Sequence, residues 1–245
     1  MRKYILFAGL ILFFSSFLFA QEQQNDISLK TLSWKLGLDG GFVVYGFPSG
    51  TLNSYGYKFE NLNGYGFYLN AVGSMPLDYK SDLLFGLGSQ SLTIFSTKER
   101  GRYSSVVGEP NPVLVNMESQ VDIDISSLYL TASYKRKFGD GFSILGGLDM
   151  HIITDCKIKQ DETIKDDRFE FIGSGKTDLI YEGDLKDHKN FQLNLKVGFG
   201  YDFVVDYKYL ITPIMSFSYP LLKLTSSNSA RVMLLTVGIN ILYIF

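Results

Sequence analysis

Apolar and polar side chains alternate one by one over long stretches of this chain. In FQLNLKVGFGYDF (191–203), the odd-numbered positions are all aliphatic or aromatic, and the even-numbered positions are polar or glycine. A period of two is typical of a β-strand, because successive side chains of a strand point to opposite faces. An α-helix would distribute the same residues around its axis. The pattern therefore predicts an all-β fold.

The same alternation recurs along the chain and predicts eight strands. Most of them exceed the ~9–11 residues that a tilted strand needs to cross a bilayer. We therefore predict an eight-stranded antiparallel up-and-down transmembrane β-barrel over residues 33–245. The expected strands are 33–45, 65–75, 81–92, 127–136, 141–154, 191–203, 208–219 and 232–245.

The connections between these strands alternate in length. Bacterial outer-membrane barrels have short periplasmic turns and longer external loops, with an even number of strands. The same arrangement here puts both barrel termini on the periplasmic side. Two of the long connections keep an alternating pattern, at 113–125 and 156–164, so we expect them to continue the barrel wall as hairpins above the membrane. The long connections are 46–63, 93–120, 155–190 and 220–230, and the short ones are 76–80, 137–140 and 204–207.

The N-terminus predicts export from the cytoplasm. Arg2 and Lys3 precede an almost wholly apolar run that ends at Ala20, so residues 1–20 are expected to be a signal peptide and 21–32 a short periplasmic segment. An uncleaved anchor helix is the alternative. Cleavage lowers the basic count from 23 to 21 against 25 acidic residues, so the net charge becomes −4 and nothing indicates a nucleic-acid partner. The single cysteine, Cys156, cannot form an internal disulfide bond.

Charged residues occupy the second face of the expected strands. An eight-stranded barrel encloses an interior that side chains nearly fill, so charges there are expected to pair with one another. We interpret them as a polar plug, and a narrow ion or proton path is the alternative. The expected lumen network is Lys35, Asp39, Lys135, Asp149, His151, Lys196 and Asp202.

The sequence does not indicate an enzyme. Asp149 and His151 share one strand face, which would suit base chemistry, but no recognisable serine motif accompanies them. Two histidines and one cysteine argue against a dedicated transition-metal site. The acid-rich run at 160–170 lacks the spacing of a calcium loop. We therefore expect no catalytic residue, no metal and no cofactor.

The segments LFAQ (18–21), LYLTASYKRKF (128–138) and FSILGGLDM (142–150), with the aromatic closing strand, resemble small outer-membrane β-barrel proteins of the Bacteroidota type. These include PorT-like proteins, and the transmembrane domains of OmpX and OmpA share the eight-strand plan. The resemblance implies an outer-membrane location and help from periplasmic chaperones and the barrel-assembly machinery. It also implies that this machinery reads the last strand, through Ile239, Ile241, Tyr243 and Phe245.

The expected function is that of a monomeric barrel with a structural or surface-interaction role, in which external loops bind an extracellular or envelope protein. One alternative is a narrow channel or a secretion accessory. Another is a soluble, lipocalin-like binding protein that turns the apolar face of its strands inward. Alternation alone does not decide which face is inside.

Overall fold

The computed structural model describes residues 33–45, 52–54, 57–60, 62–139, 141–166, 168–171, 178–185, 187–226 and 231–245. The expected signal peptide and periplasmic segment (1–32) lie outside these residues. Within the described part of the chain, no helix is long and apolar enough to span a membrane.

The regular elements of the described residues are β-strands, as the alternation predicts. In chain order they are β1 (Lys35–Tyr45), β2 (Leu52–Ser54), β3 (Tyr57–Phe59), β4 (Asn63–Asp78), β5 (Ser81–Ser104), β6 (Val113–Phe138), β7 (Phe142–Ile164), β8 (Asp178–Asp184), β9 (Phe191–Tyr201), β10 (Phe203–Val205), β11 (Tyr209–Pro220) and β12 (Leu234–Ile244).

Eight of these strands close into a ring. The hydrogen-bonded order is β1, β4, β5, β6, β7, β9, β11 and β12, and β12 pairs back onto β1 in antiparallel register from Lys35↔Ile244 to Val44↔Leu235. Closure pairs the edges that an open sheet would leave exposed. The predicted antiparallel eight-stranded barrel is confirmed, and we call this ring the barrel.

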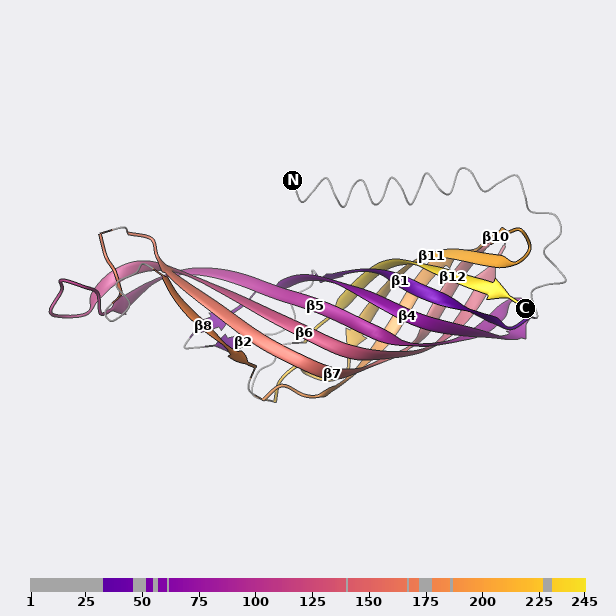
Figure 1. Ribbon diagram of the computed structural model, residues 1–245, viewed down its shortest axis with the longest axis horizontal. Coiled ribbons are helices and arrows are strands. Elements are labelled where there is room, and N and C mark those ends of the chain that lie inside the picture. The colour runs from indigo at the N-terminus through magenta and orange to yellow at the C-terminus, as the bar shows by residue number, and fades with distance from the viewer. Residues whose placement is uncertain are drawn as a thin grey trace.

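Three strands run far beyond the barrel. β5, β6 and β7 have 24, 26 and 23 residues, whereas β1 and β9 have 11 each. In Figure 1 they pass from the barrel to a projecting end, where β8 joins β7. We call this part, residues 96–104, 113–125, 156–164 and 178–184, the projecting sheet. The hairpins expected above the barrel are therefore present, and the strands that we predicted to end at 92 and 154 continue instead.

Short turns connect the strands at the other end, which we call the turn end. The β4–β5 turn is held by the Lys80 backbone N–H, which donates to Asp78 Oδ1 at 2.7 Å. In the β10–β11 turn, Asp206 and Tyr207 have φ of 49° and 54°, and the Lys208 N–H donates to the Val205 carbonyl. Two successive positive φ angles are those of a type I′ turn, whose twist suits a tight hairpin.

Candidate functional site: the barrel wall, the lumen and the projecting sheet

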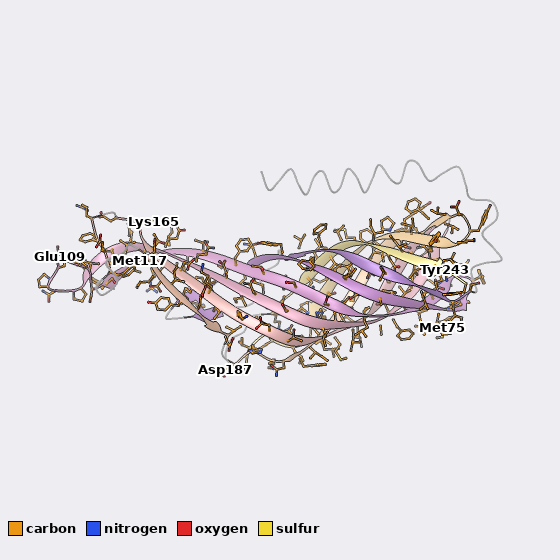
Figure 2. All side chains as sticks on the ribbon, viewed as in Figure 1. Met75, Glu109, Met117, Lys165, Asp187 and Tyr243 are labelled. Carbon is orange, nitrogen blue, oxygen red and sulfur yellow. The ribbon has the colours of Figure 1, made fainter. Side chains whose placement is uncertain are left out.

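The outer surface of the barrel is apolar. On β9, Leu195 and Val197 are 49% and 53% exposed, and their inward neighbours Asn194 and Lys196 are buried. The ten steps from Phe191 to Tyr201 extend about 34 Å, or about 26 Å in height at a tilt of roughly 40°. That height matches the apolar band of outer-membrane barrels. Figure 2 shows side chains standing out from the barrel strands all along this part of the molecule.

The apolar face changes sides at one level of the barrel wall. On β6 the outward residues below this level include Leu128, whereas above it Val121, Ile123 and Ile125 point inward and are buried. A β-bulge in β7 lies at the same level, where pairing shifts between Ser126 and Ser127. The extra residue reverses which positions of β7 face inward, from Ile153 below it to Cys156 above it, whereas on β6 the odd-numbered positions face inward throughout and the residue types change. The outward face is therefore apolar on the barrel and polar on the projecting sheet.

Charged residues form cross-strand rows on the outward face of the projecting sheet. Lys157 lies between Asp124 and Asp184 in the register, one strand on either side. Lys159 lies in the same way between Asp122 and Glu182. Opposite charges directly across neighbouring strands stabilise a sheet. These rows lie immediately above the apolar band.

Two ionic clusters occupy the lumen at the turn end. Lys35 and Lys137 both approach the buried carboxylate of Asp82, at 3.4 and 3.0 Å. Lys135 Nζ lies 2.5 Å from Asp202 Oδ1. Three of the charges expected inside, Lys35, Lys135 and Asp202, are therefore held in ion pairs, but the partner of Lys35 is a residue that we had not predicted.

A further group of polar side chains lies at mid-height in the lumen, and we call it the polar layer. It consists of Asp39, Tyr68, Tyr129, Asp149 and Lys196. Tyr129 donates its hydroxyl hydrogen bond to Asp149 Oδ1 at 3.0 Å, and Lys196 Nζ donates to the Tyr129 hydroxyl at 2.9 Å. Lys196 Nζ is 3.5 Å from Asp149 Oδ1. The Tyr68 hydroxyl donates to Asp39 Oδ1 at 3.2 Å. The layer thus crosses the lumen from β1 and β4 to β6, β7 and β9.

The glycine at position 238 gives the Tyr68 hydroxyl its place in this layer. Gly41 is paired with both Tyr68 and Gly238 in the sheet register. A Cβ atom on Gly238 would lie 2.2 Å from the Tyr68 hydroxyl oxygen, closer than real contacts allow. Because Gly238 has no side chain, there is room for the Tyr68 hydroxyl, which donates its hydrogen bond to Asp39.

His151 lies one step above the polar layer and is not part of an Asp–His pair. Its Nδ1 is 3.4 Å from Ser127 Oγ, and its ring packs against Tyr129 with centroids 4.9 Å apart. Both oxygens of Asp149 are engaged elsewhere, by Tyr129 and by the Ser218 hydroxyl at 2.8 Å. The Asp149–His151 contact that base chemistry would need is therefore not made.

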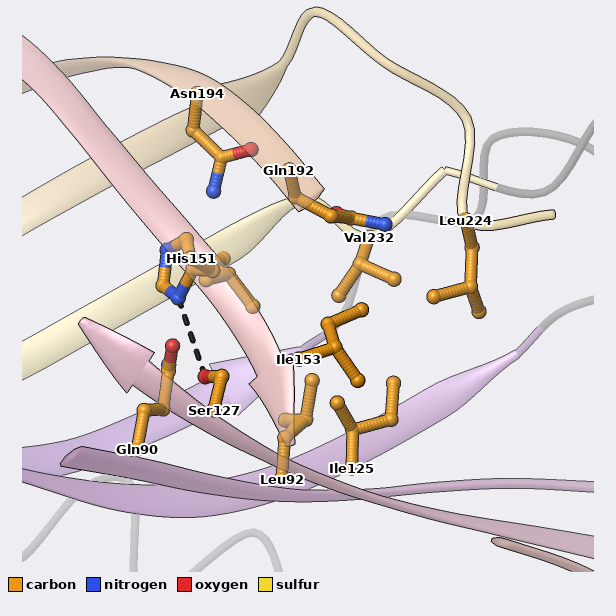
Figure 3. A pocket seen from close by; sticks show the side chains of 11 residues that line it. Gln90, Leu92, Ile125, Ser127, His151, Ile153, Gln192, Asn194, Leu224 and Val232 are labelled. Atoms are coloured by element: carbon orange, nitrogen blue, oxygen red, sulfur yellow. Dashed lines mark hydrogen bonds between the residues drawn. The ribbon is translucent and has the colours of Figure 1, made fainter. Parts of the chain in front are cut away.

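A narrow cavity of about 30 Å³ lies beside His151. Figure 3 shows polar side chains on one side of it and aliphatic side chains on the other. Gln90, Ser127, His151, Gln192 and Asn194 form the polar side. The aliphatic side consists of Leu92, Ile125, Ile153, Leu224, Val232 and Leu234.

An aliphatic cluster, which we call the roof, covers this end of the lumen. It combines inward residues of the long strands with side chains from the connections at the projecting end, such as Phe59, Leu185 and Leu224. Cys156 belongs to it, and burial raises the pKa of its thiol to about 12. At neutral pH this thiol is protonated and chemically inert.

The tip of the projecting sheet has a small core of its own. Val106, Val115, Met117, Ile164 and Phe171 are buried together there, and Val106 pairs with Phe171 in an isolated bridge. This packing adds to the main-chain hydrogen bonds that hold the projecting sheet together.

The residues expected to act as an assembly signal lie on the last strand. Ile239, Ile241 and Tyr243 point outward on β12, and Phe245 follows its end with 68% of its surface exposed. The Tyr243 ring packs edge-on against Tyr209 and Phe245. Among the described residues, no group of three or more His, Cys, Asp or Glu side chains is arranged to hold a metal ion.

Comparison with known proteins gives only distant likenesses. No protein-family model matches the chain, and no curated protein does. The crystal structure of Ail, the attachment invasion locus protein of Yersinia pestis, is similar with a TM-score of 0.33 and 14% identity, covering 87% of this chain and 99% of that chain. A second structure of Ail, in complex with the heparin analogue sucrose octasulfate, has a TM-score of 0.31 and 12% identity over the same shares. Both TM-scores are too low for the likeness to bear on function.

Two parts of the lumen were missed by sequence reasoning. Asp82 occupies the inward face of β5, two residues before Leu84, so extending the alternation back by one step would have found it. The sequence also contained a signal for the roof. In VDIDI (121–125) the apolar residues stand at odd-numbered positions, whereas Leu128 and Leu130, further along the same strand, stand at even-numbered positions.

Proposed function

We propose that this chain is an integral outer-membrane β-barrel of a Gram-negative-type bacterium, with the turn end in the periplasm and the projecting sheet outside the cell. One observation carries the proposal: charged side chains line the inside of the barrel and apolar ones its outside, up to the single level where the faces exchange. A soluble lipocalin-like barrel would need the opposite arrangement, because a continuous apolar exterior is untenable in water.

The interior supports a structural plug rather than a channel. Three features follow one another along the lumen: paired charges at the turn end, the polar layer at mid-height and the aliphatic roof. An ion would have to separate buried ion pairs and then pass an apolar cluster, and both steps are costly. We accordingly propose that the barrel does not conduct ions. We also keep the expectations that it is not an enzyme and that it is monomeric.

The projecting sheet supports a role in binding a protein at the cell surface. β8 is paired with β7 along one side. On β5, Ser96 and Lys98 donate side-chain hydrogen bonds to the Glu60 and Lys58 carbonyls, and beyond Lys98 the described residues of β5 pair with β6 alone. Free strand edges accept an additional strand through main-chain hydrogen bonds. The partner that suits such an edge is an extended polypeptide segment. During biogenesis, the closing strand with Ile239, Ile241, Tyr243 and Phe245 would be read by the barrel-assembly machinery.

A photo-crosslinking residue at Ile180 tests the binding role on intact cells. Ile180 is 62% exposed on β8, so discrete covalent protein adducts are expected there. Leu77, which is 50% exposed at the turn end, serves as the control and is expected to give none of the same adducts. A correctly inserted barrel that forms no adduct from Ile180 would contradict the binding role.

A shortened variant separates binding from folding. Removing 99–118 and 161–180, with a two-residue turn at each junction, joins strands at register pairs, since Lys98 is opposite Ser119 and Gln160 is opposite Tyr181. We expect the heat-shifted gel band of a folded barrel to persist while binding of the crosslinked partner is lost.

A further inference from the structure

We infer that the cavity beside His151 is a binding site for ordered water, and that about two water molecules complete the hydrogen bonding of the lumen there. Three residues that line this cavity each carry a buried polar atom: His151 Nε2, Gln192 Nε2 and Asn194 Oδ1. Each lacks a hydrogen-bond partner among the described residues. The three residues are 5%, 5% and 2% exposed, so bulk solvent does not reach them.

The sheet register holds these three groups together. His151 and Gln192 are directly opposite each other on β7 and β9, and Asn194 is opposite Asp149, two residues further along. The inward direction of all three is fixed by the alternation of the strands. Figure 3 shows the three side chains along the polar side of the cavity, with His151 bonded to Ser127.

The chemistry of the three atoms suits water. Gln192 Nε2 is a donor, Asn194 Oδ1 is an acceptor, and His151 Nε2 takes either role according to its tautomer. Water both donates and accepts, and a buried water commonly makes about three hydrogen bonds. A buried polar group without a hydrogen-bond partner is destabilising, so three of them lining one cavity favour the binding of water.

The size of the cavity decides between water and a larger ligand. One water needs roughly 10–15 Å³ of such space, so a cavity of about 30 Å³ holds about two. A hydrated cation or an organic molecule needs more room. The roof closes over the site with aliphatic side chains, so these waters are expected to exchange slowly with solvent.

A second cavity lies below the polar layer. It measures about 20 Å³ and is lined by Asp39, Lys196 and Asn240 among others, and Asn240 Oδ1 has no partner among the described residues. Tyr129, Asp149 and Lys196 belong to the layer that separates the two cavities. The upper waters therefore form a local site and not a segment of a continuous path.

The inference requires the folded barrel but not its membrane location, so we test it on chain refolded in detergent. Magnetic relaxation dispersion of water oxygen-17 detects waters that stay bound longer than the particle tumbles. We expect the wild-type dispersion amplitude to fall by about two waters in Gln192→Leu, which keeps the size but removes the donor. Gln120→Leu, on the outward face of the projecting sheet, is the matched control and should leave the amplitude unchanged.

His151→Phe provides a second, independent variant with the same expected loss. A heat-shifted gel band must show that each variant is folded before its amplitude is compared. Two folded variants with the wild-type amplitude would overturn the inference. So would a crystal structure with a metal ion at about 2.0–2.1 Å from His151 Nε2, the distance of a zinc–histidine bond.

Discussion

Asp149→Ala is expected to lower the free energy of unfolding by about 3–5 kcal/mol, the usual cost of removing one partner of a buried ion pair. The carboxylate is 2% exposed and accepts hydrogen bonds from Tyr129 and Ser218. Its loss leaves the Lys196 ammonium in the lumen without the acid 3.5 Å away. Urea unfolding from lipid vesicles, followed by tryptophan fluorescence of Trp34, measures the change.

The double variant Asp149→Ala/Lys196→Met is the control for this prediction. It removes the stranded charge as well, so it should recover much of the stability that the single variant loses. A loss below about 1 kcal/mol in Asp149→Ala, with no recovery in the double variant, would mean that water already solvates Lys196. That outcome would favour the alternative in which the lumen is a narrow ion or proton path.

Leu195→Arg is expected to cost about 2–4 kcal/mol, because it puts a charge on the lipid side near the middle of the apolar band. Leu195 lies close to halfway between Phe191 and Tyr201 and is 49% exposed, so the substitution disturbs little packing inside the protein. In a soluble protein an exposed leucine tolerates arginine within about 0.5 kcal/mol. The cost thus depends on what surrounds the barrel.

Gln120→Arg makes the same charge change on the outward face of the projecting sheet, where we expect an effect within about 0.5 kcal/mol. Both variants are compared by reversible unfolding from vesicles. Equal losses in the free energy of unfolding in the two arginine variants would contradict the distinction between a lipid-facing wall and a solvent-facing sheet.

The alternation of apolar and polar residues was enough to predict most of the fold. Because side chains on a strand point to opposite faces in turn, residues such as Lys35, Asp39 and Lys196 could be assigned to one face from the sequence alone. The loop asymmetry then distinguished the two ends of the barrel and put both termini at the end with the short turns. The strand ends were set too short because β5, β6 and β7 continue with good β patterning after the apolar face has changed sides.

The pairing inside the lumen was beyond sequence reasoning. Alternation assigns a face but not a height, and the height of each side chain depends on register between strands far apart in the chain. Lys35 pairs with Asp82 across β4, and the roof gathers Phe59, Leu185 and Leu224 from separate connections. Such contacts follow from closure of the ring, which no local pattern encodes.

Depth along β7 tests the central claim, that the apolar wall lies in lipid, most directly. Spin labels are attached to single cysteines at Ile144, Leu148, Ile152, Lys157 and Asp161, in the Cys156→Ser background, after reconstitution in vesicles. We expect dissolved oxygen to relax the labels at Ile144, Leu148 and Ile152 more strongly than the other two. A water-soluble nickel chelate is expected to relax the labels at Lys157 and Asp161 more strongly. The change should therefore fall between Ile152 and Lys157. A nickel chelate that reaches all five positions equally would show that water surrounds the whole wall and would contradict a membrane barrel.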